Sequence, residues 1–323
     1  MFAVSGVLLA FLECKTMSIS PILSRTFFLV IAVLAQGVVA QGIMAMFGGS
    51  AMATERLYES AEKGATIIEL YTSQGCSSCP PAEAWLNTFS DASSEGRRLW
   101  QDIIPINFHV DYWDHIGWKD PFSSSEFSQR QRNYNRHGHT HNVATPGFVV
   151  DGLGWNGWFR GQDIPRHMQS NKRGALRAEL NGDALVIEYR DLAQAATPSS
   201  SELSAKQSAS KQSTSKHYST RDLKQNTLDK LYVHIARLGI GVETHVRSGE
   251  NAGRNLRHDF VVTGYRKARL ELGLAVPDVQ TGIWNKALVI PEALAVDVDR
   301  EALAIWVTES DDPKPLQIAA GWL

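Results

Sequence analysis

The sequence predicts two folded domains, an α/β domain over residues 63–170 and a β-rich, sandwich-like domain over residues 171–323. In the first region, strand-like and helix-like segments alternate, which is typical of α/β architecture. The second region opens with two runs of alternating apolar residues joined by Asn181-Gly182, a strong hairpin signal. A chain of 323 residues is long enough to build two domains with their own cores.

Five elements are expected in the first region, in the order strand, helix, strand, helix, strand. Their expected ranges are 65–71, 82–89, 103–110, 127–136 and 148–150. The first and third ranges are short apolar runs that fit buried strands. In the first helix, Trp85 and Phe89 are four residues apart and share one face.

The second region is expected to be mainly β. The hairpin pairs 176–180 with 185–189, and further strands are expected at 231–238, 258–262, 303–307 and 317–322. A tract of Ser, Lys and Gln over 197–220 has no periodic apolar residues, so it cannot offset the entropy of ordering. It is predicted to be a disordered loop inserted between strands, with a regulatory tail as the alternative.

The first 40 residues have the pattern of a secretory signal peptide. Arg25 precedes the apolar run 27–35, and Val38-Val39-Ala40 places small residues before a cleavage site after Ala40. Residues 41–62 would then be a linker. The alternative is an uncleaved membrane anchor over 27–47. In both cases the folded part is expected to be exported, periplasmic or secreted, with membrane contact only if the leader is retained.

Charge narrows the list of partners. The chain has 32 Lys and Arg against 34 Asp and Glu, so no strong overall field favours nucleic acid. We therefore expect no nucleic-acid partner. An apolar content of 43% is ordinary for a globular protein.

The cysteines give the clearest functional signal. Cys76 and Cys79 enclose two serines and are followed by Pro80-Pro81, whereas Cys14, the third cysteine, lies in the expected leader. Proline fits only the first turn of a helix, so a helix should begin at this motif. The positive end of a helix favours a thiolate. We predict Cys76 as an exposed nucleophile and Cys79 as a more deeply placed resolving thiol.

Two other interpretations of the cysteine pair remain open. An inert disulfide is one, although a bridge that closes so short a loop adds little stability. The other is half of a zinc site, for which a second Cys-x-x-Cys is missing.

Polar and aromatic residues near the second expected strand form a further candidate site. His109 and Asp111 share one strand face, and Trp113 follows them. They are candidates for binding substrate or metal near the cysteines, and a packed aromatic loop is the alternative. His139 is the middle of three histidines at alternate positions 137, 139 and 141, a weak candidate for copper or zinc.

Five motifs of this chain resemble an exported, thioredoxin-like bacterial family known as domain of unknown function 1223. The motifs cover residues 69–82, 109–114, 117–122, 129–132 and 249–254, so the resemblance includes most of the expected mature chain. It implies a thioredoxin-like N-terminal domain and an exported location. It implies no established reaction, since the family name records none.

The thioredoxin resemblance also implies roles for individual residues. Pro146 would be a cis-proline beside the cysteines, with the backbone of Thr145 binding an extended substrate; from the residues alone, a trans turn proline is the default. Glu69 would be a buried acid that moves a proton to and from Cys79, although a solvent-facing strand residue is equally compatible. Gly75 stands where thioredoxins carry Trp, so their redox potential does not transfer.

Together these observations predict an exported thiol-disulfide oxidoreductase. Cys76, Cys79, Pro146 and Glu69 would be catalytic, and Thr145, Gly75, Trp113 and Asp111 would bind substrate. Its partners would be exported protein or small-molecule thiols and a redox protein that recycles the pair, with no cofactor.

Two alternatives use the same residues differently. One is a protein that handles copper, with Cys76, Cys79 and a histidine such as His109 or His139 as soft ligands. The other is a non-catalytic binding module that uses the groove beside the cysteines for protein contact.

Overall fold

The computed structural model describes residues 55–61, 64–90, 96–165, 174–191, 230–273 and 283–323. The expected leader at 1–40 and the expected loop at 197–220 lie outside these ranges. Residues 54–323 form one compact unit. Within the described ranges, neither α-helix has the length and apolar character needed to cross a bilayer.

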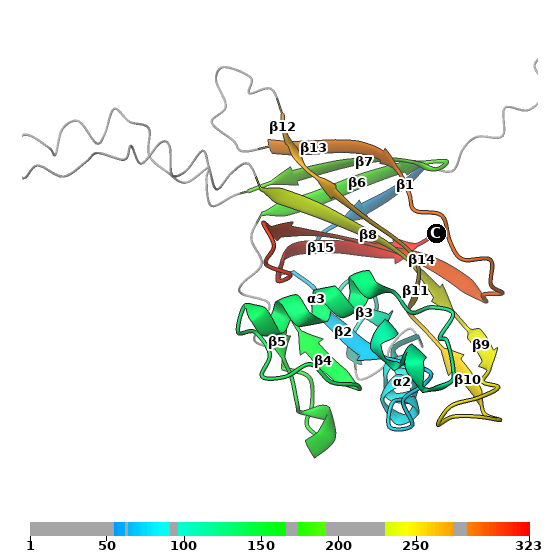
Figure 1. Ribbon diagram of the computed structural model, residues 1–323. Helices are drawn as coiled ribbons and strands as arrows, with labels where there is room; N and C mark the ends of the chain where they lie inside the picture. Colours follow the sequence, from blue (N-terminus) through cyan, green and yellow to red (C-terminus); the bar gives the residue numbers. More distant parts are fainter. Residues whose placement is uncertain (1–54, 62–63, 91–95, 166–173, 192–229, 274–282) are drawn as a thin grey trace, which may run out of the picture. The chain divides into compact units, whose positions relative to one another are not determined.

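An eight-stranded mixed sheet is the centre of the fold (Figure 1). In spatial order its strands are β15 (Pro315–Trp322), β14 (Arg300–Glu309), β8 (Leu231–Ile240), β11 (Val261–Arg269), β3 (Ile103–His109), β2 (Thr66–Thr72), β4 (Gly147–Val150) and β5 (Leu153–Gly154). β2 and β3 run parallel, with Thr72 opposite His109, and β2 pairs antiparallel with β4. Strands from both ends of the chain therefore share one sheet.

A second sheet of five strands packs beside the first. Its order is β1 (Glu55–Glu59), β6 (Ala175–Asn181), β7 (Ala184–Arg190), β13 (Ile283–Val289) and β12 (Glu271–Leu272). A separate two-stranded ribbon joins β9 (Val242–His245) to β10 (Asn255–His258). Figure 1 shows the five-stranded sheet above the eight-stranded one.

Alternation along the shared strands creates two hydrophobic cores. On β8 and β14, Val233 and Ile305 pack with the five-stranded sheet, whereas Leu238 and Ala304 belong to the core around β2, β3 and the helices. Successive strand side chains point to opposite faces, so these two strands contribute to both cores. The unit therefore has a layered interior with the eight-stranded sheet in the middle.

Two α-helices, α2 (Pro80–Asn87) and α3 (Ser125–Arg136), lie beside this sheet (Figure 1). The hydroxyl of Ser124 caps α3 by accepting from the backbone N–H of Glu126. Short 3-10 turns are η1 (Thr88–Ser90), η3 (Asp111–Ile116) and η4 (Trp158–Arg160). α3 buries Phe127 and Tyr134 in the same core as β2 and β3.

The predicted α/β, thioredoxin-like class is wrong, because the structure is a sheet-rich fold. The strands β2 to β5 do not form a sheet of their own. They are one half of a sheet whose other half, β11, β8, β14 and β15, comes from residues 231–322. Val261 of β11 pairs with Asn107 of β3 and makes that connection. Local periodicity identifies each strand but contains no information on such distant pairing.

Several element predictions are nevertheless confirmed by the strands and helices at those positions. The segments at 65–71, 103–110 and 148–150 are strands, and the hairpin 176–189 forms with its turn at Asn181-Gly182. The expected linker at 41–62 contains a strand that the sequence analysis missed, β1, which pairs with β6. The expected boundary near residue 170 is not a break in the eight-stranded sheet.

Candidate functional site

The cysteine motif lies where β2 leads into α2. Cys79 is the N-cap of α2, with Pro80 and Pro81 in the first turn, and its carbonyl accepts from the backbone N–H of Ala82 at 2.9 Å and of Glu83 at 3.1 Å. The helix therefore begins at the motif, as the two prolines predict. Both cysteines are free thiols.

Both sulfur-bearing side chains are buried, which corrects one expectation. Cys79 is 0% exposed, as predicted for the deeper thiol, but Cys76 is only 1% exposed. The prediction of a solvent-exposed Cys76 is therefore wrong for this conformation. Its neighbours Ser77 and Ser78 are exposed, so Cys76 lies one layer below the surface. Its sulfur contacts the Ser78 hydroxyl at 3.2 Å and the Thr145 carbonyl oxygen at 3.8 Å.

The pKa values of the two thiols are shifted in opposite directions. A hydrogen bond donated by Cys79 lowers the pKa of Cys76 to about 6; burial opposes this, and hydrogen bonds from the side chains of Ser78 and Thr145 add to it. Burial raises the pKa of Cys79, and the thiolate of Cys76 raises it further. Of the two sulfurs, Cys76 is therefore the one that more readily forms a thiolate, which is the nucleophilic form of cysteine.

The segment before β4 lies against the Cys76 sulfur. The Thr145-Pro146 peptide is cis, in agreement with what the family resemblance implies, and the carbonyl of Thr145 faces the thiol. Gly147 follows, and a Cβ there would lie 2.6 Å from the Ala144 carbonyl oxygen and 2.9 Å from Nε2 of Gln131. A side chain does not fit in this position, so the glycine allows the segment to approach α3.

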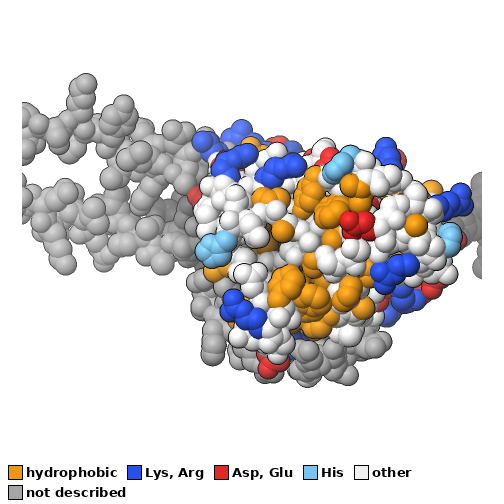
Figure 2. Space-filling model, turned by 60° about the horizontal axis from the view of Figure 1, so that its bottom comes forward, with side chains coloured by type: hydrophobic (Ala, Val, Ile, Leu, Met, Phe, Trp, Pro, Cys, Tyr) orange, Lys and Arg blue, Asp and Glu red, His pale blue; other side chains and the backbone are white. Residues whose placement is uncertain are grey.

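A cavity of about 510 Å³ opens beside the thiol pair. Ser78 and Thr145, which both contact the Cys76 sulfur, also line this cavity. Its wall includes the aromatic side chains of Phe148, Trp158 and Phe159, and Phe159 is 57% exposed. Figure 2, which turns the bottom of Figure 1 forward, shows hydrophobic side chains gathered on this face of the molecule. An apolar surface beside a thiol suits an extended or apolar substrate segment.

The motif 249–254 forms hydrogen bonds with the backbone of the cysteine loop. The side-chain amide of Asn251 donates to the carbonyls of Gln74 and Cys76, both at 2.9 Å. A carboxylate oxygen of Glu250 accepts from the backbone N–H of Ser77 at 2.9 Å. Residues 175 positions apart in the chain thus fix the backbone of the thiol loop. Sequence analysis missed this contact, although it identified both motifs.

Glu69 is engaged with α3, and no hydrogen bond among the described residues joins it to Cys76 or Cys79. Its carboxylate accepts from Nε and Nη2 of Arg130 at 2.8 and 2.7 Å, and from the hydroxyls of Tyr71 and Tyr134, each at 2.6 Å. Both carboxylate oxygens of Glu69 therefore accept two hydrogen bonds each. Arg130 also donates to the Pro313 carbonyl at 3.0 Å. This buried ion pair ties β2 and α3 to the turn before β15.

Gly75 and Trp113 lie near the thiol loop, but Asp111 is engaged elsewhere. A Cβ on Gly75 would be 3.4 Å from the Cβ of Trp113, so the two residues pack together. Asp111 accepts from the hydroxyl of Ser128 and thereby joins η3 to α3. Of the predicted substrate-binding residues, Thr145 and Gly75 are the two that adjoin Cys76 directly in space or sequence.

The two histidine candidates for metal lie in separate clusters. His109 is grouped with Glu83 and His258 in the interior, and His139 with His137 and Asp312 at the end of α3. Each cluster places its potential ligand atoms within 4.8 Å of one another. Neither cluster of the described residues includes a cysteine. Sequence analysis missed Glu83 and His258, because no local pattern brings residues so far apart together.

The sequence of this chain matches a known protein family over most of its length. Residues 67–307 match the family described as "Protein of unknown function (DUF1223)". The chain belongs to the DUF1223 family. The match runs from β2 into β14 and thus includes the thiol pair, Thr145-Pro146 and the motif 249–254.

Comparisons with characterised proteins and solved structures add little to the DUF1223 assignment. No curated protein matches the sequence. A crystal structure of an Agrobacterium tumefaciens protein is similar at 20% identity and a TM-score of 0.47, covering 82% of this chain and 95% of that one. HBP35 of Porphyromonas gingivalis is similar at 12% identity and a TM-score of 0.45, covering 82% of this chain and 76% of that one.

Proposed function

We propose that this DUF1223 protein catalyses thiol-disulfide exchange through Cys76 and Cys79. The observation that carries the proposal is the Cys76 sulfur itself. It lies at the start of α2, its pKa is lowered to about 6, and it contacts two residues that line an apolar cavity. A thiolate is the attacking species in disulfide exchange, so a thiol with this pKa is largely reactive at neutral pH.

The exchange proceeds in two steps. The Cys76 thiolate attacks one sulfur of a substrate disulfide, so that a Cys76–substrate bond forms and the other substrate sulfur leaves as a thiolate. Cys79 then gives up its proton and attacks the Cys76 sulfur, which forms the Cys76–Cys79 disulfide and releases the second substrate thiol. Two electrons pass from the protein to the substrate. A dithiol partner must then reduce the protein disulfide, and the reverse sequence oxidises a dithiol substrate.

Burial of Cys76 defines how a substrate must reach it. Ser78 and Thr145 lie between the sulfur and the cavity, and Ser78 is exposed. Because Ser78 is exposed, we expect a rotation of its side chain to open a path from the cavity to the sulfur. The substrate then lies along Thr145 and the aromatic wall, which favours exported protein thiols or apolar small-molecule thiols over small hydrophilic ones.

An exported location is part of the proposal. The leader pattern at 1–40 supports it, and so does the chemistry, because disulfide substrates persist outside the reducing cytosol. Copper handling by the cysteines is less well supported, since no imidazole joins them in a cluster of described residues. A non-catalytic binding module would use the same cavity but would not need the thiols.

Trapping of mixed disulfides tests the proposal. In Cys79→Ser the second step cannot occur, so a covalent Cys76–substrate adduct should accumulate with a model disulfide and with exported proteins. Cys76→Ser is the matched control and should form no adduct. If Cys79→Ser gives no more adduct than Cys76→Ser under oxidising and reducing conditions, the protein is not an oxidoreductase of this type. Unchanged partner binding in Cys76→Ser would then favour a binding module.

A further inference from the structure

A buried polar cluster lies against α2. Glu83 of α2, His109 at the end of β3 and His258 at the end of β10 each offer one potential ligand atom, and these atoms all lie within 4.8 Å of one another. Their exposed fractions are 3%, 0% and 0%. The three residues come from segments that the eight-stranded sheet and the β9–β10 ribbon bring together.

His109 is oriented by a carboxylate and keeps one ring nitrogen unused. Its Nδ1 lies 2.7 Å from a carboxylate oxygen of Asp120. The same oxygen accepts from the backbone N–H of Gln74 at 2.8 Å, and the other accepts from the backbone N–H of Phe122 at 2.9 Å. In the neutral ring whose Nδ1 donates to Asp120, Nε2 carries a lone pair. That nitrogen is buried and has no hydrogen-bond partner among the described residues.

His258 is oriented by an amide. Its Nε2 lies 2.9 Å from Nε2 of Gln74, and the Gln74 carbonyl oxygen accepts from the indole N–H of Trp118 at 2.9 Å. An amide nitrogen only donates, so Nε2 of His258 must accept. Its Nδ1 therefore carries the proton and donates to a carboxylate oxygen of Glu83. The rings of His109 and His258 are 5.0 Å apart.

Glu83 and Asn107 complete the cluster. One carboxylate oxygen of Glu83 accepts from the hydroxyl of Thr72 at 2.6 Å. The other, which contacts His258, lies 3.4 Å from Nδ2 of Asn107. The amide oxygen of Asn107 is buried and, like Nε2 of His109, lacks a partner within the described part of the chain. Asn107 and His109 are two residues apart on β3, so they face the same side.

A purely structural hydrogen-bond network does not explain this arrangement. Such networks in protein interiors pair nearly all their buried polar atoms. Here Nε2 of His109 and Oδ1 of Asn107 are buried and lack partners among the described residues, and both side chains lie beside the Glu83 carboxylate. Unpartnered acceptor atoms beside a buried carboxylate are the arrangement that a cation requires.

We propose that Glu83, His109 and His258 form a binding site for a divalent transition-metal ion. Two imidazoles and a carboxylate are ligands that suit Zn²⁺ and related ions. The contact of His109 with Asp120 is the carboxylate–histidine pairing typical of metal ligands. When the ion binds Nδ1 of His258, the ring proton moves to Nε2, and the Gln74 side chain turns so that its carbonyl oxygen accepts from that nitrogen. The Asn107 oxygen or a water fills a fourth position. A surface cavity of about 500 Å³, lined in part by Glu83, Asn87 and Leu256, gives access.

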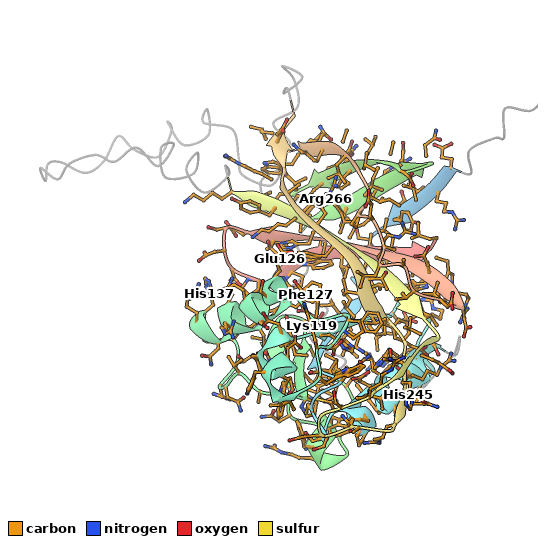
Figure 3. The ribbon with its side chains drawn as sticks, turned by 45° about the vertical axis from the view of Figure 1, so that its right-hand side comes forward. Lys119, Glu126, Phe127, His137, His245 and Arg266 are labelled. Atoms are coloured by element: carbon orange, nitrogen blue, oxygen red, sulfur yellow. The ribbon has the colours of Figure 1, made fainter. Side chains whose placement is uncertain are left out.

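The other histidine cluster does not carry the same inference. In it, Nε2 of His139 already pairs with Asp312 at 2.9 Å. Nε2 of His137 has no hydrogen-bond partner among the described residues and lies 3.5 Å from a carboxylate oxygen of Asp311. The three side chains of this cluster are 19% to 37% exposed, so water can replace an ion there. His137 lies at the end of α3, and His245 lies on β9 at the other side of the view in Figure 3. These histidines therefore provide controls.

Metal binding by the full chain tests the proposal, in a background that removes the thiols. In Cys76→Ser/Cys79→Ser, Co²⁺ should bind with one equivalent and give visible absorption bands of nitrogen and oxygen ligation, and Zn²⁺ should displace it. Adding His109→Ala or His258→Ala should weaken Zn²⁺ binding by at least about tenfold. The double change His137→Ala/His139→Ala, and His245→Ala, should leave the affinity unchanged.

Two outcomes overturn the proposal. One is the absence of Co²⁺ bands and of retained Zn²⁺ in the thiol-free protein, which requires no ligand variant to fold. The other is Zn²⁺ binding that is lost with the His137→Ala/His139→Ala change but not with His109→Ala. Circular dichroism of each variant shows whether it is folded. Because the background lacks both cysteines, this result is independent of whether the protein exchanges disulfides.

Discussion

The side-chain amide of Asn251 holds the backbone of Cys76, which lies 175 residues earlier in the chain. It donates to the carbonyl oxygens of Gln74 and Cys76, both at 2.9 Å, and is itself fully buried. Arg254 in turn donates to the amide oxygen of Asn251 at 2.8 Å. The conformation of the thiol loop therefore depends on a turn that follows β9.

Asn251→Ala should destabilise the fold and loosen the thiol loop. The change removes the Asn251 donor from the Gln74 carbonyl and one of two donors from the Cys76 carbonyl, and an unpaired buried carbonyl typically costs about 1–3 kcal/mol in the free energy of unfolding. Urea denaturation of the reduced protein measures that loss. Ala252→Ser is a control in the same turn, because Ala252 is exposed, and its unfolding midpoint should stay close to that of the unchanged protein. Equal midpoints for both variants would show that Asn251 does not hold the loop.

The alkylation rate of Cys76 should follow its lowered pKa. The thiolate reacts and the thiol does not, so the rate with iodoacetamide should rise with pH to half its maximum near pH 6 and fall about tenfold per pH unit below that. Mass spectrometry of the labelled peptide measures the rate. In Cys79→Ala the hydrogen bond from Cys79 is gone, so the midpoint should move to higher pH. A midpoint that does not move would exclude Cys79 as the cause.

Gly147→Ala should slow exchange more than it destabilises the fold. A Cβ at this position would meet the Ala144 carbonyl oxygen at 2.6 Å and Gln131 at 2.9 Å, so the segment 144–146 must shift away from α3 and alter its contact with Cys76. Disulfide-exchange assays with a model substrate should show a lower rate constant. Val143→Ala, at an exposed site before the same segment and outside the cavity lining, should leave the rate unchanged. Equal rates for the two variants would mean that the segment does not position the substrate.

Glu69→Gln should reduce stability without affecting the second step of exchange. Glu69 and Arg130 are 0% and 6% exposed, and breaking a buried ion pair by removing one charge costs about 3–5 kcal/mol. Thermal unfolding should show this loss, whereas Glu126→Gln at an exposed site on α3 should not. Rapid-quench measurement of Cys76–Cys79 disulfide formation should give the same rate as in the unchanged protein. A slower rate in folded Glu69→Gln would restore Glu69 as a proton carrier for Cys79.

Most of the individual elements around the site could be predicted from the sequence. The apolar run 65–71, Pro80-Pro81 and the polar segment 127–136 each contain local information, namely strand periodicity, a helix start and a helical pattern. The helix start also places Cys79 deeper than Cys76, and this burial of Cys79 was predicted. The exposure of Cys76 was not, because it depends on Thr145 and Ser78, and only Ser78 is a neighbour in sequence.

The predicted fold class was wrong because it, too, depends on contacts between residues that are distant in sequence. The alternation of strands and helices between 65 and 150 was identified, but the sheet continues through Val261 into strands that begin 80 or more residues later. Likewise, Glu69 was suggested as the acid near the thiols because its position in sequence is suitable. In the structure its side chain faces α3, and Glu83 is the buried carboxylate on the α2 side of the sheet.

By itself, the sequence determined that two cysteines stand at the start of a helix, since two consecutive prolines can be accommodated only in a first helical turn. The tertiary structure decided everything that requires residues from distant strands to meet: the Thr145 carbonyl at the thiol, the Asn251 amide behind it, and the imidazoles of His109 and His258 around Glu83. The physical reason is that helix starts and strand periodicity arise from interactions within a few residues. Sheet pairing, in contrast, is set by the burial of apolar faces across the whole chain.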